Sequence, residues 1–123
     1  MRVSDKKRKK NALIKQADEL AREICFHRDH YKCVRCGRGD IQWAHIRSRR
    51  HLSTRWDAWN CLTLCGGCHE FFWHQNPLEA VPWFEENWPE RAEHLRVVAR
   101  QKITVDVQDV VICLRAEVKE LER

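Results

Sequence analysis

Two short sequences, Cys33-Val34-Arg35-Cys36-Gly37 and Cys65-Gly66-Gly67-Cys68-His69, frame the central part of this chain. Each contains a Cys-x2-Cys pair, and 28 residues separate the two pairs. This spacing is typical of two loops that offer four thiolates to one tetrahedral zinc ion, a site that leaves no position open for substrate. We therefore expect a structural Zn²⁺ bound by Cys33, Cys36, Cys65 and Cys68. Free thiols, a redox pair and an iron–sulfur cluster are the alternatives, and the glycines beside the cysteines favour the mononuclear site.

The length and charge of the chain limit its class. Its 123 residues suit one domain, but the segment around the cysteine pairs is too short to bury an adequate apolar core without a metal. The formal net charge of +5 and the isoelectric point near 8.9 favour a polyanionic partner. We expect an α+β fold in a single domain over residues 11–123. Its zinc-bound core spans about residues 31–76, helices at 11–27 and 77–123 flank this core, and residues 1–10 form a basic arm.

The cysteine usage indicates a reducing compartment. Seven cysteines, an odd number, and a charged N-terminal segment with no apolar stretch behind it argue against a secreted disulfide framework. No apolar run approaches the length of a membrane-spanning helix. We expect a cytoplasmic protein with metal-bound thiolates and no membrane partner. Cys25, Cys61 and Cys113 lie outside the paired motif and are expected to be small buried apolar residues.

Hydrophobic periodicity predicts the remaining elements. Residues 2–10 carry six Lys or Arg against one Asp, so this arm is either a disordered solubilising tail or a phosphate-binding segment. A helix follows from about Lys10 to His27, and a docked helix is expected at 107–121, with a dimeric coiled coil as the alternative. Two antiparallel strands at 41–46 and 62–64, joined by a long ordered loop, precede a helix at 70–75. Further helical segments are expected at 78–88 and 89–102.

Three polar residues stand out in the central segment: His45 ends the first strand, Asn60 follows fifteen positions later, and His69 comes nine positions after that. A neutral imidazole can take a proton from water, which phosphodiester hydrolysis requires, so activity should rise as an imidazole with a pKa of about 6.5 deprotonates. A second imidazole can hold a divalent metal that polarises the phosphate. The side-chain amide of Asn60 can pin a loop or orient the base.

The loop after the first strand is rich in arginine, whose guanidinium group binds phosphate in a bidentate manner. We expect four residues to contact nucleic-acid phosphates: Arg47, Arg49, Arg50 and Arg55. A solvated loop is the alternative. The tryptophans near the motif are expected to be mostly core, with base stacking as the alternative role for one of them: Trp43, Trp56, Trp59 and Trp73.

The segments Ala44-His45-Ile46, Asn60 and Cys65-Gly66-Gly67-Cys68-His69 resemble the HNH endonuclease family. The fold of that family is the ββα-metal finger, and the likeness is to its subgroup with a structural tetra-cysteine zinc. Arg47-Ser48-Arg49 and Arg55-Trp56-Asp57 also resemble phage recombination nucleases of the NinG type. The similarity covers about 45 of the 123 residues. It implies a DNA endonuclease with one catalytic divalent metal, commonly Mg²⁺, Mn²⁺, Ni²⁺ or Zn²⁺, in a bacterial or phage-infected cell.

The resemblance implies roles for three residues: His45 as general base, Asn60 as the residue that fixes the loop carrying the base, and His69 as a metal ligand. Two positions depart from the family pattern. Many members have Asp or His before the base, where this chain has Ala44, and many have a further ligand four residues after the last histidine, where it has Trp73. His74, one step later, is the candidate second ligand, rotated by about 100° from the expected direction.

These departures leave several interpretations open. The site borrows a ligand from Asp57, His51 or Asp40, binds metal weakly, or is inactive. A metal-dependent DNA endonuclease is the leading interpretation of the function. The alternatives are a zinc-stapled nucleic-acid-binding module without catalysis, and an adaptor in a phage packaging or recombination complex.

Overall fold

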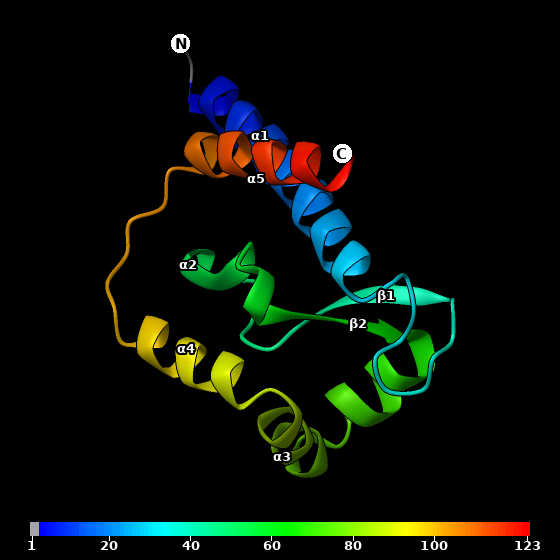
Figure 1. Cartoon of the computed structure of the whole chain (residues 1–123). Helices are drawn as coiled ribbons and strands as arrows, with labels where there is room; N and C mark the ends of the chain where they lie inside the picture. Colours follow the sequence, from blue (N-terminus) through cyan, green and yellow to red (C-terminus); the bar gives the residue numbers. More distant parts are fainter. Residues whose placement is uncertain (1–2) are drawn as a thin grey trace.

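The structure, a computed structural model, describes residues 3–123, so Met1 and Arg2 of the expected basic arm lie outside it. Its elements, in chain order, are α1 (Val3–Arg28), β1 (Ile41–His45), α2 (Leu52–Arg55), η1 (Ala58–Asn60), β2 (Cys61–Cys65), η2 (Cys68–His74), α3 (Pro77–Asn87), α4 (Pro89–Ala99) and α5 (Val107–Leu121). Figure 1 shows the two strands in the middle, with α1 and α5 on one side and α3 and α4 on the other. The expected α+β class is confirmed.

The two strands form an antiparallel hairpin, as predicted. Their pairing runs from Ile41 opposite Cys65 to His45 opposite Cys61, so the second strand is longer than expected by one residue at each end. The connection between them is long and is ordered by α2 and the 3₁₀ turn η1. Every residue of β2 is buried, because helices cover both faces of the hairpin.

Alternation of side chains along the strands gives the hairpin two different apolar faces. On one face, Ala44, Leu62 and Leu64 pack against α3 and α4. On the other face, Trp43 packs against α1 and α5. The second cluster is built from the buried residues Ala17, Ala21, Trp56, Val107, Val111 and Leu114. The hairpin is therefore the layer on which both halves of the core are built.

Helix α1 starts at Val3, earlier than the predicted start near Lys10. Residues 3–10 are thus helical and not a disordered tail, because the segment holds good helix formers and no Gly or Pro. The helix spans 26 residues. Helix α5 begins with a cap, in which the Asp106 side chain accepts a hydrogen bond from the Gln108 N–H. Helices α1 and α5 pack together (Figure 1), which confirms that the C-terminal helix is docked.

The last turn of α1 is anchored to β2 by charged groups. Arg28 donates to the carbonyl of Cys61 at 2.9 Å and to the carbonyl of Ala58. Asp29, paired with Arg28, accepts a hydrogen bond from the Thr63 N–H at 3.1 Å. Burial opposes ionisation of Asp29, but the bonds from Arg28 and Thr63 outweigh it and lower the pKa of this carboxyl. These contacts hold the helix end next to the first cysteine pair.

The three cysteines outside the paired motif differ in their burial. Cys25 and Cys61 are buried, as expected, whereas Cys113 is exposed and its expected burial is wrong. Val107, Val111 and Leu114 form the packed stripe of α5, and Cys113 lies beside this stripe on the solvent side. Among the helices that the structure describes, none is both long and apolar enough to cross a membrane.

Candidate functional site

The four motif cysteines come together at the open end of the hairpin. Their sulfur atoms all lie within 4.8 Å of one another, and the Cys36 and Cys65 sulfurs are 3.5 Å apart. Tetrahedral zinc with Zn–S bonds of about 2.3 Å requires sulfur separations of about 3.8 Å, so the set fits one zinc ion. Within residues 3–123 it is the one cluster of three or more side chains of metal-ligand type. The arrangement is consistent with the expected structural Zn²⁺ site.

Each cysteine pair sits on a tight turn whose backbone points toward sulfur. The Cys36 N–H donates to the Cys33 sulfur at 3.5 Å, and the Cys68 N–H donates to the Cys65 sulfur at 3.4 Å. Gly37 adopts a φ of 83°, a conformation that favours glycine, so the first turn depends on this residue.

The thiols of this cluster do not ionise equally. Burial opposes ionisation of Cys33, but backbone N–H groups outweigh it and lower the pKa of its thiol to about 7. Burial and the neighbouring thiols raise the pKa of Cys68 to about 12, although Arg35 donates to its sulfur at 3.5 Å. Because the Cys68 thiol resists ionisation beside the other three sulfurs, all four cysteines become thiolates only when a cation balances their charge.

His69 and His74 converge into a second group of metal-ligand type. Their Nε2 atoms lie 2.9 Å apart. The Nδ1 atom of His69 donates to the side-chain oxygen of Gln42 at 2.8 Å, because an amide oxygen only accepts, so the Nε2 atom of His69 carries the lone pair and accepts a hydrogen bond from the Nε2–H of His74. Burial and the neighbouring His74 lower the pKa of His69, which favours the neutral, ligating form. Two imidazole nitrogens at cis positions around a metal, with bonds of 2.0–2.1 Å, lie about 2.9 Å apart, so the pair fits two ligands of one ion.

A π-helical turn explains why these two histidines meet. In an α-helix, residues five positions apart differ in direction by about 140°. The helix η2 is a π-helix over its whole length, Cys68–His74, and the Gln75 N–H donates to the Glu70 carbonyl at 3.1 Å in the i to i+5 pattern. This wider turn places His74 beside His69. The rotation expected from α-helical geometry is therefore wrong for this segment.

Trp73, at the position where the family pattern has a ligand, points the other way. Its Nε1 donates to the backbone carbonyl of His45 at 3.0 Å, and its ring contacts that of Phe84. Trp73 thereby joins η2 to the end of β1 instead of facing the histidine pair.

His45 lies at the end of β1, half-buried and fixed in orientation. Its Nε2 is 3.0 Å from the carbonyl oxygen of Arg55, and because a carbonyl only accepts, Nε2 carries the proton and Nδ1 keeps a lone pair. Burial lowers the pKa of His45 to about 4, although the bond to Arg55 acts in the opposite direction. At neutral pH the side chain is therefore an uncharged proton acceptor.

Strand alternation separates His45 from the histidine pair. The His45 ring lies with Trp43 on the α1 side, at a ring-centroid distance of 4.1 Å, whereas Gln42, the partner of His69, points to the other face. No hydrogen bond between described residues joins the His45 ring to His69 or His74. The His45 ring and the histidine pair therefore lie on opposite faces of β1.

Asn60 is fully buried and fixes the loop that follows β1. Its side-chain oxygen accepts a hydrogen bond from the Arg47 N–H at 2.7 Å, and its side-chain nitrogen donates to the Arg47 carbonyl at 3.1 Å. Both bonds span thirteen positions of the chain. The loop therefore leaves β1 along one defined path.

The four loop arginines fall into two groups. Arg55 donates to Asp18 of α1 from Nε at 2.9 Å and from Nη2 at 2.7 Å, and Arg49 donates to the same carboxylate at 3.0 Å. The side chain of Arg55 is only 17% exposed, so Arg55 mainly anchors the loop to α1. Arg49 and Arg50 are exposed, and Arg47 is half-buried.

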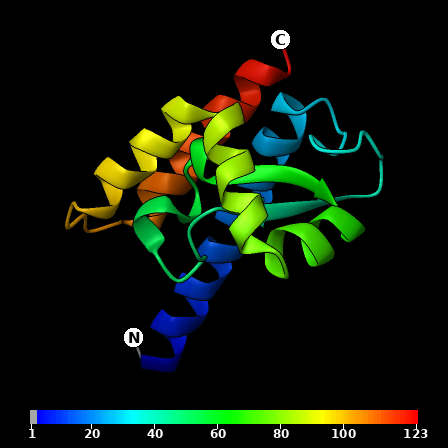
Figure 2. The ribbon, with the colours of Figure 1, turned by 90° about the horizontal axis from the view of Figure 1, so that it is seen from below.

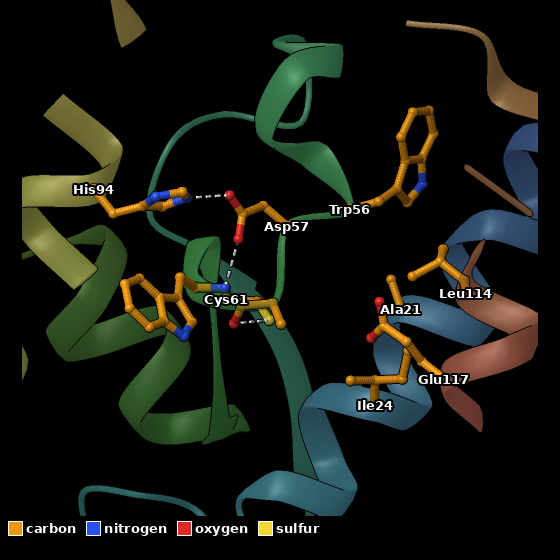
Figure 3. A pocket seen from close by; sticks show the side chains of 10 residues that line it. Ala21, Ile24, Trp56, Asp57, Cys61, His94, Leu114 and Glu117 are labelled. Atoms are coloured by element: carbon orange, nitrogen blue, oxygen red, sulfur yellow. Dashed lines mark hydrogen bonds and ion pairs between the residues drawn. The ribbon is translucent and has the colours of Figure 1, made fainter. Parts of the chain in front are cut away.

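Asp57 is not available to the histidine pair. Its Oδ1 accepts a bond from the Trp59 N–H at 2.9 Å, and its Oδ2 accepts a bond from His94 at 2.5 Å. Figure 3 shows this His94–Asp57 pair at the edge of a cavity of about 430 Å³ between α1, η1, α4 and α5. His51 and Asp40, the other residues considered as borrowed ligands, are exposed and lie outside the clustered ligand sets of residues 3–123.

The tryptophans around the motif are mainly structural. Trp56 is buried and donates to Asp18 at 2.8 Å, and Trp43 and Trp73 are half-buried. Trp59 is 40% exposed and packs edge-on against His94.

Sequence patterns missed three residues of these sites. Gln42 orients His69, Asp18 holds Arg49 and Arg55, and Arg35 lies beside Cys68 with its guanidinium 3.8 Å from the centre of the Phe72 ring. Each acts on a partner at least 27 positions away in the chain. No local signal marks such contacts.

Comparisons with family models, with curated proteins and with solved structures find no match for this chain. What can be said of its class therefore comes from its own residues. The chain is a small α+β domain with an antiparallel hairpin, packed terminal helices and a four-cysteine cluster suited to zinc.

Proposed function

We propose that this protein is a metal-dependent DNA endonuclease of the HNH type, with β1, β2 and η2 as its ββα-metal finger. The observation that carries the proposal is the convergence of the His69 and His74 Nε2 atoms at 2.9 Å. One N–H···N hydrogen bond accounts for this separation, and the same separation also suits two imidazoles that ligate one divalent ion.

In this proposal each residue has one task. His69 and His74 hold the catalytic ion, and Gln42 keeps the Nε2 lone pair of His69 directed at it. A bound divalent ion supplies charge stabilisation at the phosphate and at the leaving oxygen. The candidate ions are Mg²⁺, Mn²⁺, Ni²⁺ and Zn²⁺, and the tetra-cysteine zinc keeps a purely structural role.

His45 acts as the general base. Its Nδ1 takes a proton from water as the water oxygen bonds to phosphorus, and the bond from phosphorus to the leaving sugar oxygen breaks. The backbone carbonyl of Arg55 supports this by accepting a hydrogen bond from the Nε2–H of His45, which fixes the tautomer. Asn60 fixes the strand-to-loop path on which His45 lies. Arg47, Arg49 and Arg50 provide phosphate contacts, and Arg55 contributes mainly by holding the loop.

The test is cleavage of supercoiled plasmid DNA with each of the four metals. The variants His45→Ala, His69→Ala and His74→Ala should each lose activity by about two orders of magnitude or more. Excess metal should partly restore the His69 and His74 variants, because mass action compensates for weaker binding. It should not restore His45→Ala, which lacks the base. His51→Ala, which removes an exposed loop histidine, serves as the control and should cleave like the wild type.

A nucleic-acid-binding module without catalysis is the second candidate, as a free protein or as an adaptor in a phage packaging or recombination complex. Two observations favour it: the histidine pair supplies only two protein ligands, and Ala44, at a position where the family has a ligand, is fully buried. A wild-type protein that binds DNA but cuts nothing with any of the four metals would establish this alternative.

A further inference from the structure

The solvent face of α1 carries a straight row of basic side chains. Arg8, Lys15 and Arg22 are spaced seven residues apart, and each is exposed. Seven residues in an α-helix return almost to the same direction, with a drift of about 20°. Ala17 and Ala21, which are buried in the core, lie on the opposite face of the same helix. The row is therefore a separate surface that the packing of the domain leaves open.

The row leads into a groove next to the candidate active site. The groove, of about 580 Å³, lies between α1 and β1. Among its lining residues are Lys15, Arg22, Arg49 and Gln42. Gln42, at the edge of the groove, is also the residue that bonds His69. Basic groups thus continue from this groove outward along α1.

The acidic side chains on this face are either paired with arginines or open to water. Asp18 in the groove already binds Arg49 and Arg55. Asp5 pairs with Arg8 at 3.5 Å, but both side chains are exposed, and such a pair is weak in water. Glu19 is exposed at the groove edge. The basic row is extended by Lys7, Lys9 and Lys10 around the first turns of α1, which Figure 2 shows reaching beyond the other elements.

We propose that this face of α1 is a second DNA-contact surface, which follows the phosphate backbone of duplex DNA on one side of the cut. The placement of this surface beside a cleavage site rests on the proposed function. Its attraction to phosphate does not. From Arg8 to Arg22 is fourteen residues, or about 21 Å along the helix axis. That length corresponds to about six base pairs of duplex. A rigid row of charges at fixed spacing suits a rigid duplex better than a flexible single strand.

The experiment measures DNA binding without divalent metal, so that cleavage plays no part. The triple variant Arg8→Gln/Lys15→Gln/Arg22→Gln is compared with a control of equal charge change, Arg100→Gln/Lys102→Gln/Lys119→Gln, whose residues are exposed on α5 and on the connection between α4 and α5. Fluorescence anisotropy is recorded with duplexes of about 30 and about 8 base pairs over a range of salt, because each lost phosphate contact lowers the salt slope by about 0.9.

We expect the α1 variant to bind the long duplex at least about tenfold more weakly, with a salt slope reduced by about 2 to 3. The short duplex, too short to reach both surfaces, should show a much smaller difference, and the control should behave like the wild type. An α1 variant that binds the long duplex like the control, or a wild type that prefers single strands of the same length, would overturn the inference.

The two proposals fail in different ways. A wild type that binds through α1 but never cleaves plasmid DNA retains this inference and loses the nuclease proposal. A protein that cleaves normally while the α1 variant binds normally retains the nuclease proposal and loses this inference.

Discussion

At the scale of single residues, burial decides what His45 can do. An exposed histidine has a pKa of about 6.5, whereas burial lowers the pKa of His45 to about 4. The hydrogen bond to the Arg55 carbonyl leaves Nδ1 as the accepting nitrogen. His45 therefore stays neutral across the physiological range and is a weaker base than a free imidazole.

The pH profile of cleavage tests this shift. Because the pKa of His45 is lowered to about 4, the base is deprotonated at every pH well above that value. We expect the metal-dependent rate to vary little through pH 6.5, instead of rising there as the sequence alone predicted. The measurement is the single-turnover rate between about pH 5 and pH 8, where ordinary imidazole titration would be visible. An inflection near 6.5 that disappears in His45→Ala would show that burial does not control this group.

Ala44 supplies a second test at this scale. Its side chain is fully buried in the cluster with Leu62 and Leu64, so an added carboxylate would lose its water without gaining a partner. We expect Ala44→Asp to lower the free energy of unfolding by about 2–4 kcal/mol. Denaturant unfolding checks this, with Ala12→Asp on exposed α1 surface as the control. A variant of unchanged stability that binds Mn²⁺ more tightly would instead show that position 44 opens onto the metal.

At the scale of elements, the contact between α1 and the arginine loop holds the long connection of the hairpin in place. Asp18 accepts hydrogen bonds from Arg49, Arg55 and the indole of Trp56. Burial raises the pKa of Asp18, but these bonds and charges outweigh it, and the net shift is downward. One carboxylate therefore ties the loop to a helix that lies 37 positions earlier in the chain.

Replacing this carboxylate should loosen the loop. Asp18→Asn leaves the guanidinium of Arg55, only 17% exposed, without its counter-charge, and we expect a loss of about 1–3 kcal/mol in the free energy of unfolding. Amide hydrogen exchange in residues 47–57 should increase more than exchange in β1 and β2. Glu19→Gln, a neighbouring exposed carboxylate, is the control. Equal exchange in the two variants would mean that Asp18 does not hold the loop.

At the scale of the whole molecule, the cysteine cluster joins two segments that are far apart in the sequence. The first pair precedes β1 and the second pair ends β2 and starts η2. Cys33, Cys65 and Cys68 are part of the same apolar cluster as Leu62 and Phe84, so metal binding and core packing are coupled.

Removal of the structural metal should therefore unfold the domain. We expect Cys65→Ser to abolish cooperative unfolding and the strand signal in far-UV circular dichroism, because metal-binding free energy is part of the folding free energy. Metal analysis of the wild type should give one zinc per chain. Cys113→Ser, at an exposed cysteine outside the cluster, should retain both zinc and fold. A folded, zinc-free wild type would contradict the structural role of the cluster.

The sequence by itself determined what depends on short spacings. Two Cys-x2-Cys pairs identified Cys33 and its partners, and helical periodicity predicted the docked α5. These patterns succeed because neighbours within one turn or one strand constrain each other directly. Glycine placement likewise indicated the turn at Gly37.

Only the tertiary structure decided which distant groups meet. The π-helical turn brings His74 to His69, Gln42 reaches His69 across 27 positions, and Asp18 takes up Arg55 across 37 positions. The lowered pKa of His45 likewise depends on the layers packed around β1. Such contacts and burial arise from how the hairpin, α1 and η2 pack together. Local propensity does not predict that packing.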